Sequence, residues 1–163
     1  MNCKTVKLKG FFEPSRTRRF EQIFMSEEKE PLKAASKKRT SKYGPPPDSC
    51  DPDQTWSLLI FKGKDLLERL VLRQDHYTFG RESEGVDVVT AHESCSKLHA
   101  VIQFLRKGDK AIPYVLDMES SNGTTLNDTA LQPRRYYEMR SGDVIKFGAS
   151  TRDYVIMNIK HNV

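Results

Sequence analysis

The stretch RSGDVIKFGASTRDYVIMNI, residues 140–159, contains two short runs of alternating side chains. The first run lies at 143–147 and the second at 154–159, and the turn residues RSGD and FGAS stand beside them. Alternation with a period of two is typical of a β-strand that buries one face. The stretch therefore predicts two strands joined by a turn.

The same pattern of short strand-like runs extends back along the chain to Trp56. Turn signals such as KGKD, KGDK and SSNG separate short β-rich runs, and no long run has a helical period. About ten short strands in roughly 110 residues predict an all-β fold, a sandwich of antiparallel sheets. The runs are TWSLLIF, LLERLVL, YTFGR, VDVV, AVIQFL, YVLDM, TTLN, RYYEM, DVIKFG and YVIMNI.

Positive charge is concentrated in the first fifty residues. Residues 1–50 carry 12 Lys and Arg against 6 Asp and Glu, whereas residues 51–163 carry 15 against 16. Together with the proline run in YGPPPDSCDP, this contrast predicts a basic, mostly disordered tail over 1–50 and one folded domain over 51–163. Such a tail is attracted to RNA or acidic proteins without specificity, and a merely solvated tail is an equal alternative.

Several classes of protein are not expected. The cysteines Cys3, Cys50 and Cys95 are odd in number and widely spread, which indicates a reducing compartment and no disulfide framework. No apolar run approaches about 18 residues, so a membrane span is not expected. The N-terminus lacks the apolar core of a secretion signal. The run KKR at 37–39 could serve as a nuclear import signal.

The segment HESCSKLH, residues 92–99, is rich in groups that perform chemistry in other proteins. His92, Cys95 and His99 have ligand-like spacing, but a structural zinc site usually needs four ligands from two clusters, and the second cluster is missing. Ser96 and His99 have neither a matched acid nor an oxyanion turn. The segment DMESSNG departs from the calcium-loop pattern. We therefore expect no metal, no cofactor and no enzymatic activity.

Three loops together suggest an anion site instead. Gly80-Arg81 ends one predicted strand, residues 94–97 precede a second, and residues 120–123 follow a third. Loops of a sandwich gather at its edges, where the strands hold them in place. These loops offer a guanidinium, an ammonium, several hydroxyls and a carboxamide. Such a donor-rich set suits a phosphate, which has a charge near −2 and three acceptor oxygens.

These motifs resemble those of a known family. FGR at 79–81, SKLHA at 96–100 and SSNGT at 120–124 follow, in order, the pattern of the forkhead-associated (FHA) domain, a phosphothreonine-binding module. The resemblance covers residues 56–160 and implies an eleven-strand antiparallel β-sandwich. Its functional residues carry over where this sequence matches the motifs.

Five residues match positions that face the ligand in the family. The resemblance implies that Arg81 grips the phosphate, that Ser96 donates to it, and that Asn122 fixes the peptide backbone beside the phosphothreonine. Lys97 stands where the family often has Arg or Asn. Ser121 stands where a side chain often reaches the phosphate or bridges to it.

Four more residues match neighbouring positions. The resemblance implies that His99 buttresses the loops and that Gly80 and Gly123 are turn glycines. Ser94 lies where a residue can help to select the side chain three positions after the phosphothreonine. It is therefore counted with the residues expected to bind the phosphopeptide.

Longer segments narrow the resemblance. HESCSKLHAVIQF, PYVLDMESSNGT and RRYYEMRSGDVIKFG are similar to a splicing-associated subgroup, that of the Smad nuclear-interacting protein and the yeast pre-mRNA leakage protein. This implies a nuclear adaptor subunit of the pre-mRNA retention and splicing (RES) complex, associated with the spliceosome. Its implied partners are an RNA-recognition-motif subunit and a Bud13-like subunit. A structural spliceosomal protein whose phosphate pocket is not used is the alternative.

The tail contains one candidate docking segment. In the subgroup, a segment resembling F-x-P-S-G followed by leucines docks on the RNA-recognition-motif subunit. Here FEPS at 12–15 is followed by arginine, and TRRF stands in place of the leucines. We expect the cluster that includes Phe11, Phe12, Pro14 and Phe20 to order on that partner. The alternative is that it packs on the domain's own surface.

Overall fold

The computed structural model describes residues 33–34 and 43–159 of the 163-residue chain. Every regular element in these residues is a β-strand, so the prediction of an all-β fold is confirmed. No helix in this part of the chain could cross a membrane. The elements are a two-residue β1 (Lys33–Ala34) and then eleven strands: β2 (Thr55–Lys62), β3 (Asp65–Leu72), β4 (His76–Gly80), β5 (Val88–Val89), β6 (Ala100–Lys107), β7 (Lys110–Asp117), β8 (Thr124–Leu126), β9 (Thr129–Ala130), β10 (Tyr136–Glu138), β11 (Val144–Phe147) and β12 (Arg152–Ile159).

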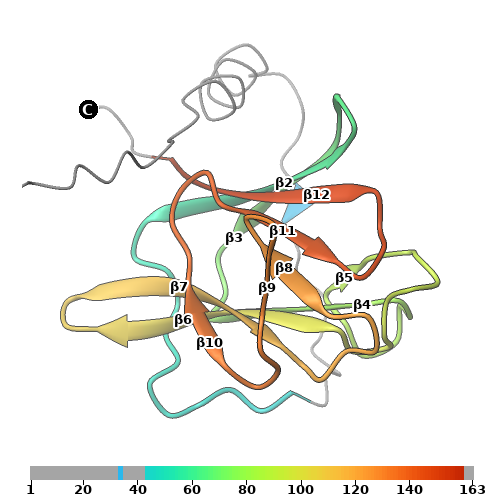
Figure 1. Ribbon diagram of the computed structural model, residues 1–163. Coiled ribbons are helices and arrows are strands. Elements are labelled where there is room, and N and C mark those ends of the chain that lie inside the picture. The colour runs from blue at the N-terminus through green and yellow to red at the C-terminus, as the bar shows by residue number, and fades with distance from the viewer. Residues whose placement is uncertain (1–32, 35–42, 160–163) are drawn as a thin grey trace, which may run out of the picture. The chain divides into compact units, whose positions relative to one another are not determined.

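The strands form the two sheets of a sandwich (Figure 1). One sheet has the order β1-β3-β2-β12-β11-β8-β9, and the other has the order β10-β7-β6-β4-β5. The alternating runs at 143–147 and 154–159 form β11 and most of β12, which pair antiparallel with Ile145 opposite Tyr154. Most neighbouring strands are antiparallel as predicted, but β1 with β3 and β4 with β5 are parallel.

The parallel pairing of β4 with β5 has a local cause. The loop after β4 brings Asp87 back beside Thr78, whose backbone N–H and hydroxyl both donate to Oδ2 of Asp87 at 2.8 Å. The chain therefore re-enters the sheet beside the middle of β4 and continues in the same direction, with Val89 opposite Gly80. The carbonyl of Gly80 also accepts the N–H of Thr90 at 2.8 Å, which fixes the end of β4.

Aromatic side chains from both sheets meet in the core. The ring centroid of Phe147 lies 5.1 Å from that of Phe79 and 4.7 Å from that of Tyr154, and all three residues are buried. Burying a side chain of this size stabilises the fold by about 1.5–3 kcal/mol. Phe79 directly precedes Gly80, so this core anchors the strand end that presents Arg81.

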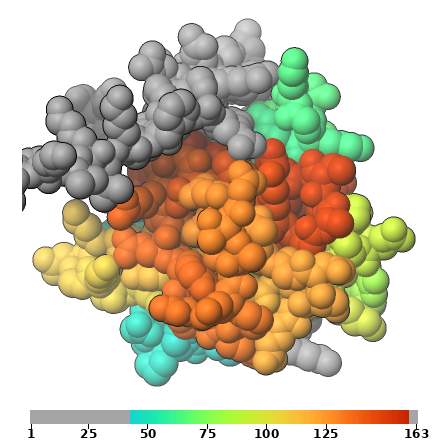
Figure 2. All heavy atoms as spheres, viewed as in Figure 1, coloured from blue at the N-terminus to red at the C-terminus, as the bar shows by residue number. Residues whose placement is uncertain are grey.

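Residues 43–50, here named the strap, pack on the outer face of the five-stranded sheet. The Tyr43 hydroxyl donates to Oε1 of Gln103 at 3.0 Å, and Nε2 of Gln103 donates to Oγ of Ser49 at 2.7 Å. The Tyr43 ring meets the His76 ring edge-on at 5.2 Å. Figure 2 shows the strap among the cyan atoms along one side of the surface. The sequence analysis assigned these residues to the tail. In the structure they supply two hydrogen-bond partners of the buried Gln103 side chain and a ring contact for the buried His76.

Candidate functional site

Three segments meet at one edge of the sandwich: the end of β4, the segment before β6, and the loop after β7. The backbone N–H of Arg81 donates to the carbonyl of Ser96 at 2.9 Å, and that of His99 donates to the carbonyl of Phe79 at 2.7 Å. The N–H of Met118 in turn donates to the carbonyl of His99 at 2.9 Å. The structure thus brings together the three loops that the sequence analysis combined.

A close approach of two backbones at this edge requires Gly80. A Cβ at this position would lie 1.8 Å from the carbonyl oxygen of Lys97 and 2.6 Å from its carbonyl carbon. Non-bonded heavy atoms pack best at about 3.5–4.0 Å, so any side chain here would push the 96–97 segment away from β4. The glycine therefore sets how close Arg81 lies to Ser96.

His99 joins two of the loops from inside the fold. Its Nδ1 accepts the backbone N–H of Ser96 at 3.0 Å, and its Nε2 donates to the carbonyl of Gly123 at 3.0 Å. These partners require a neutral ring with its hydrogen on Nε2. Burial lowers the pKa of His99, and the Gly123 carbonyl and the Asp117 carboxylate raise it only in part. Such contacts are those expected of a buttressing histidine.

A buried carboxylate shapes the loop after β7. Oδ1 of Asp117 accepts the hydroxyls of Ser120 and Thr124, both at 2.6 Å, and Oδ2 accepts the backbone N–H of Ser120 at 3.0 Å. Hydrogen bonds to a carboxylate are stronger than neutral ones, so the turn is held firmly. Gly123 has φ +74°, a left-handed conformation that glycine adopts without strain. The sequence analysis considered the segment DMESSNG, which begins at Asp117, only as a calcium loop and missed this role.

The same loop reaches across to Ser96. The backbone N–H of Ser121 donates to Oγ of Ser96 at 3.1 Å, and Nδ2 of Asn122 donates to the carbonyl of Ser94 at 2.7 Å. Because Oγ of Ser96 accepts in this contact, its own hydrogen remains available. Residues 43–159 provide no acceptor for that hydrogen, so the hydroxyl can donate to a ligand at the edge.

Ser94 is engaged inside the protein. Its Oγ lies 2.7 Å from Nδ1 of His92 and accepts the backbone N–H of Ala149 at 2.9 Å. The serine thus ties the 92–96 segment to the turn after β11. Its expected part in selecting peptide sequence stays a prediction. Its bracing contact with Ala149 joins residues far apart in the sequence, so no sequence pattern indicates it.

Arg81 and Lys97 supply positive charge to the edge. Their side chains are 43% and 73% exposed, so both are accessible from solvent. Nη1 of Arg81 donates to the carbonyl of Glu93 at 3.4 Å, a long bond that leaves most of the guanidinium donors unused. Oε1 of Glu82 lies 3.3 Å from Nζ of Lys97 and 3.9 Å from Nη2 of Arg81. Sequence reasoning did not single out Glu82.

The arrangement can bind an anion. It combines two accessible cations with the Ser96 hydroxyl, the exposed Ser121 and the Asn122 carboxamide. By contrast, Cys95 is buried, and its thiol donates to the carbonyl of Phe147 at 3.7 Å, which gives it a packing role. Within the described residues, no group of three or more His, Cys, Asp or Glu could hold a metal ion.

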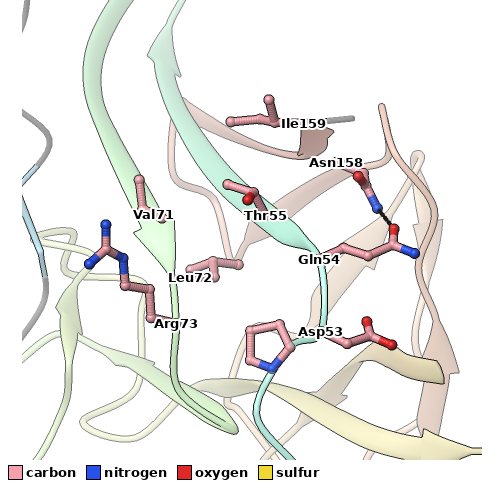
Figure 3. Close-up of a pocket in the computed structure, with 9 residues that line it drawn as sticks. Asp53, Gln54, Thr55, Val71, Leu72, Arg73, Asn158 and Ile159 are labelled. Atoms are coloured by element: carbon pink, nitrogen blue, oxygen red, sulfur yellow. Dashed lines mark hydrogen bonds between the residues drawn. The ribbon is translucent and has the colours of Figure 1, made fainter. Parts of the chain in front are cut away.

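A pocket of about 590 Å³ lies elsewhere, between the start of β2 and the ends of β3 and β12 (Figure 3). Asn158 donates to Gln54 on its wall. At the other end of β12, Arg152 donates to the carbonyl of Thr90, beside the end of β4. The pocket is therefore at the opposite end of β12 from the anion site. None of the predicted ligand-facing residues lines it.

Comparisons with known proteins identify the family. Residues 77–148 match the FHA domain, and this range contains all three sequence motifs. A solved structure of the yeast Pml1 splicing factor, described with its integration into the RES complex, matches with a TM-score of 0.68 and 31% identity. The match covers 75% of this chain and 100% of the Pml1 chain. The chain belongs to the FHA domain family.

Two curated relatives share the FHA domain. The FHA domain-containing protein DDL of Arabidopsis thaliana is 42% identical over an alignment of 127 residues, and the match covers 71% of this chain and 40% of DDL. The Smad nuclear-interacting protein 1 of Mus musculus is 39% identical over an alignment of 127 residues, and the match covers 72% of this chain and 33% of that protein. The chain thus matches well under half the length of these relatives. With the Pml1 structure, they confirm the predicted resemblance to the splicing-associated subgroup.

The predicted docking segment lies outside the described residues. Phe11, Phe12, Pro14 and Phe20 all precede residue 33, where the described part of the chain begins. The expected disorder of the tail and its docking on a partner therefore stay predictions. Every residue named for the anion site lies between 80 and 123, within the described part of the chain.

Proposed function

We propose that this FHA domain binds a phosphothreonine-containing segment of another protein, and that the chain is an adaptor subunit of the RES complex. The phosphate would lie at the edge formed by the ends of β4 and β7 and the start of β6. There it would replace solvent around Arg81, Ser96 and Lys97. The chain would act by binding and would catalyse no reaction.

The available hydroxyl of Ser96 is the observation that carries the phosphate proposal. It is held by the N–H of Ser121 at 3.1 Å and by the neighbouring backbone bond from Arg81 to the Ser96 carbonyl. A hydroxyl donor fixed beside an accessible guanidinium and an ammonium matches the three oxygens and the charge near −2 of a phosphorylated threonine. A carboxylate offers fewer oxygens and less charge to the same donors.

The role in splicing rests on the relatives. The Pml1 structure concerns a splicing factor integrated into the RES complex, and one curated relative is named as a nuclear-interacting protein. This similarity supports a nuclear location. The subgroup resemblance implies RNA-recognition-motif and Bud13-like subunits, and we propose these as the partners of the chain. The tail cluster at 11–20 would supply the docking segment, and its basic residues would add nonspecific contact with RNA.

Affinity purification from nuclear extract tests both parts. The tagged wild-type chain, the Arg81→Ala variant and a chain lacking residues 1–30 are purified with and without phosphatase treatment, and bound proteins are identified by mass spectrometry. We expect Arg81→Ala or phosphatase to remove a phosphoprotein but to retain the RES subunits, and the shortened chain to do the reverse. If Arg81→Ala and phosphatase both leave the set of proteins unchanged, the phosphate role is refuted and a purely structural adaptor remains. If the shortened chain also retains the RES subunits, the docking of the tail is refuted.

A further inference from the structure

The cations of the anion site already have an anionic partner within the chain. Oε1 of Glu82 lies 3.3 Å from Nζ of Lys97 and 3.9 Å from Nη2 of Arg81. One carboxylate oxygen therefore stands near both charges that the proposed phosphate would use. Glu82 follows Arg81 directly at the end of β4, so the fold keeps it at this edge.

A phosphate and the Glu82 carboxylate compete for the same donors. Lys97 forms its ion pair with Glu82, and no other ion pair of Lys97 is present in residues 43–159. The side chains of Arg81, Glu82 and Lys97 are 43%, 45% and 73% exposed, so the carboxylate can swing into solvent when a ligand arrives. The structure holds a closed arrangement, with Glu82 on the cations, and moving the carboxylate into solvent would open both cations to a ligand.

We propose that Glu82 is an internal competitor that lowers the affinity of this site for every anion and so sets the threshold for binding. This inference rests on the proposed phosphate function and adds a control to it. When only a fraction of molecules is open, the apparent Kd equals the intrinsic Kd divided by that fraction. A weak ligand then falls below useful affinity, while a phosphothreonine segment with additional contacts still binds.

The expected size of the effect is modest because the pair is exposed. Exposed ion pairs are individually weak and are screened by salt. For two such contacts we expect an open fraction of about one third to one tenth, so that removing the carboxylate raises affinity about three- to tenfold. The closed state delays association, and it does not act on the complex once formed. The gain should therefore appear in the association rate.

Three variants separate competition from general electrostatics. Glu82→Gln removes the competing charge, and Glu84→Gln makes the same charge change two residues away, where the carboxylate forms no ion pair in residues 43–159. Glu82→Asp keeps the charge and shortens the side chain by one methylene group, which weakens its reach to Lys97. If contact is what matters, Glu82→Asp should resemble Glu82→Gln. If charge alone matters, it should resemble the wild type.

Binding is measured by stopped-flow fluorescence with two probes at 0.15 M salt: inorganic phosphate by competition, and a phosphothreonine peptide selected from a library with randomised flanks. We expect Glu82→Gln to increase affinity for both probes by one common factor, about three- to tenfold, with an unchanged dissociation rate for the peptide. Glu84→Gln should change affinity by less than about twofold. In a Lys97→Met background, the gain from Glu82→Gln should shrink.

The outcomes distinguish this inference from the function on which it rests. If the wild-type chain binds the peptide through Arg81, but Glu82→Gln and Glu84→Gln have equal effects, the competitor is refuted and the phosphate function stands. A gain confined to the dissociation rate would also refute it, because that result indicates repulsion within the complex. If neither the wild type nor any Glu82 variant binds either probe, both proposals fail.

Discussion

Replacing Gly80 by alanine should damage both the stability of the domain and its anion site. The new Cβ would lie 1.8 Å from the carbonyl oxygen of Lys97. Even a tight contact of about 3.0 Å requires the two segments to separate by roughly 1.2 Å. Such a shift strains three backbone hydrogen bonds, from Arg81 to Ser96, from His99 to Phe79 and from Thr90 to Gly80.

The magnitude follows from these contacts. Inserting a methyl group into a packed site typically costs about 1–3 kcal/mol, and a weakened backbone hydrogen bond adds about 0.5–1.5 kcal/mol. We therefore expect Gly80→Ala to lower the free energy of unfolding by about 2–4 kcal/mol. Because Arg81 and Ser96 are carried apart by the shift, affinity for a phosphothreonine peptide should fall at least about tenfold, even where the variant is fully folded.

Urea unfolding followed by tryptophan fluorescence measures the change in stability. The chain has one tryptophan, Trp56, which is buried and packs near Phe104. Gly44→Ala is the matched control, because a Cβ there has no neighbour within 4 Å and its φ needs no glycine. We expect Gly44→Ala to unfold at the wild-type urea concentration. Equal midpoints and equal peptide affinities for the two alanine variants would refute the close-approach argument.

Three further predictions concern the supports of the site. Burial lowers the pKa of His99, so the neutral form that stabilises the fold is fully present above the unfolded pKa of about 6.5. As the pH drops below that value, the free energy of unfolding should fall by at most about 1.4 kcal/mol per pH unit. Urea midpoints measured from pH 8 to 5 should depend less on pH in His99→Gln than in the wild type, and parallel profiles would contradict this. Asp117→Asn loses charge-assisted hydrogen bonds from Ser120 and Thr124, so the free energy of unfolding should fall by about 1.5–3 kcal/mol in thermal unfolding. Peptide binding should also weaken. An unchanged melting temperature would count against the turn's dependence on charge. We propose that the strap belongs to the folded domain. A chain that starts at residue 51 should therefore be less stable than one that starts at residue 43, by at least about 2 kcal/mol. Equal urea midpoints for the two chains would place the start of the folded domain at residue 51.

The strands could be predicted from the sequence because the alternation of side chains and the turn signals indicate the same element boundaries. The alternating runs at 143–147 and 154–159 are strands in the structure, and the turns RSGD and FGAS lie at their ends. What could not be predicted depends on contacts between segments that are far apart in the sequence. Every residue of β4 is buried, because Tyr43 and Asp87 cover its outer side chains. Periodicity alone cannot reveal a strand face that a distant segment covers.

In the candidate site, too, some residues could be predicted from the sequence and others could not. Motif resemblance predicted roles for Arg81, Ser96 and His99, because each stands at a fixed place in a short pattern, and the structure brings their segments together. It could not find the competing carboxylate of Glu82, whose effect depends on distances to two cations in different loops. It also missed Asp117 as a loop support, because one buried carboxylate with two hydroxyl donors has no distinctive spacing of its own.

The central claim is that this FHA domain recognises a phosphate at the edge that contains Arg81 and Ser96. Its most direct test is calorimetric titration of the wild-type chain with a threonine peptide in phosphorylated and unphosphorylated forms, using a peptide selected from a library with randomised flanks. Arg81→Ala is compared with Arg73→Ala, an exposed arginine on the distant pocket. A charge-assisted bond contributes about 1.5–3 kcal/mol, so loss of Arg81 or of the phosphate should weaken binding at least about tenfold, while Arg73→Ala should bind as the wild type does. Equal affinity for the two peptide forms, or equal affinity of the two arginine variants for the phosphorylated form, would contradict the claim.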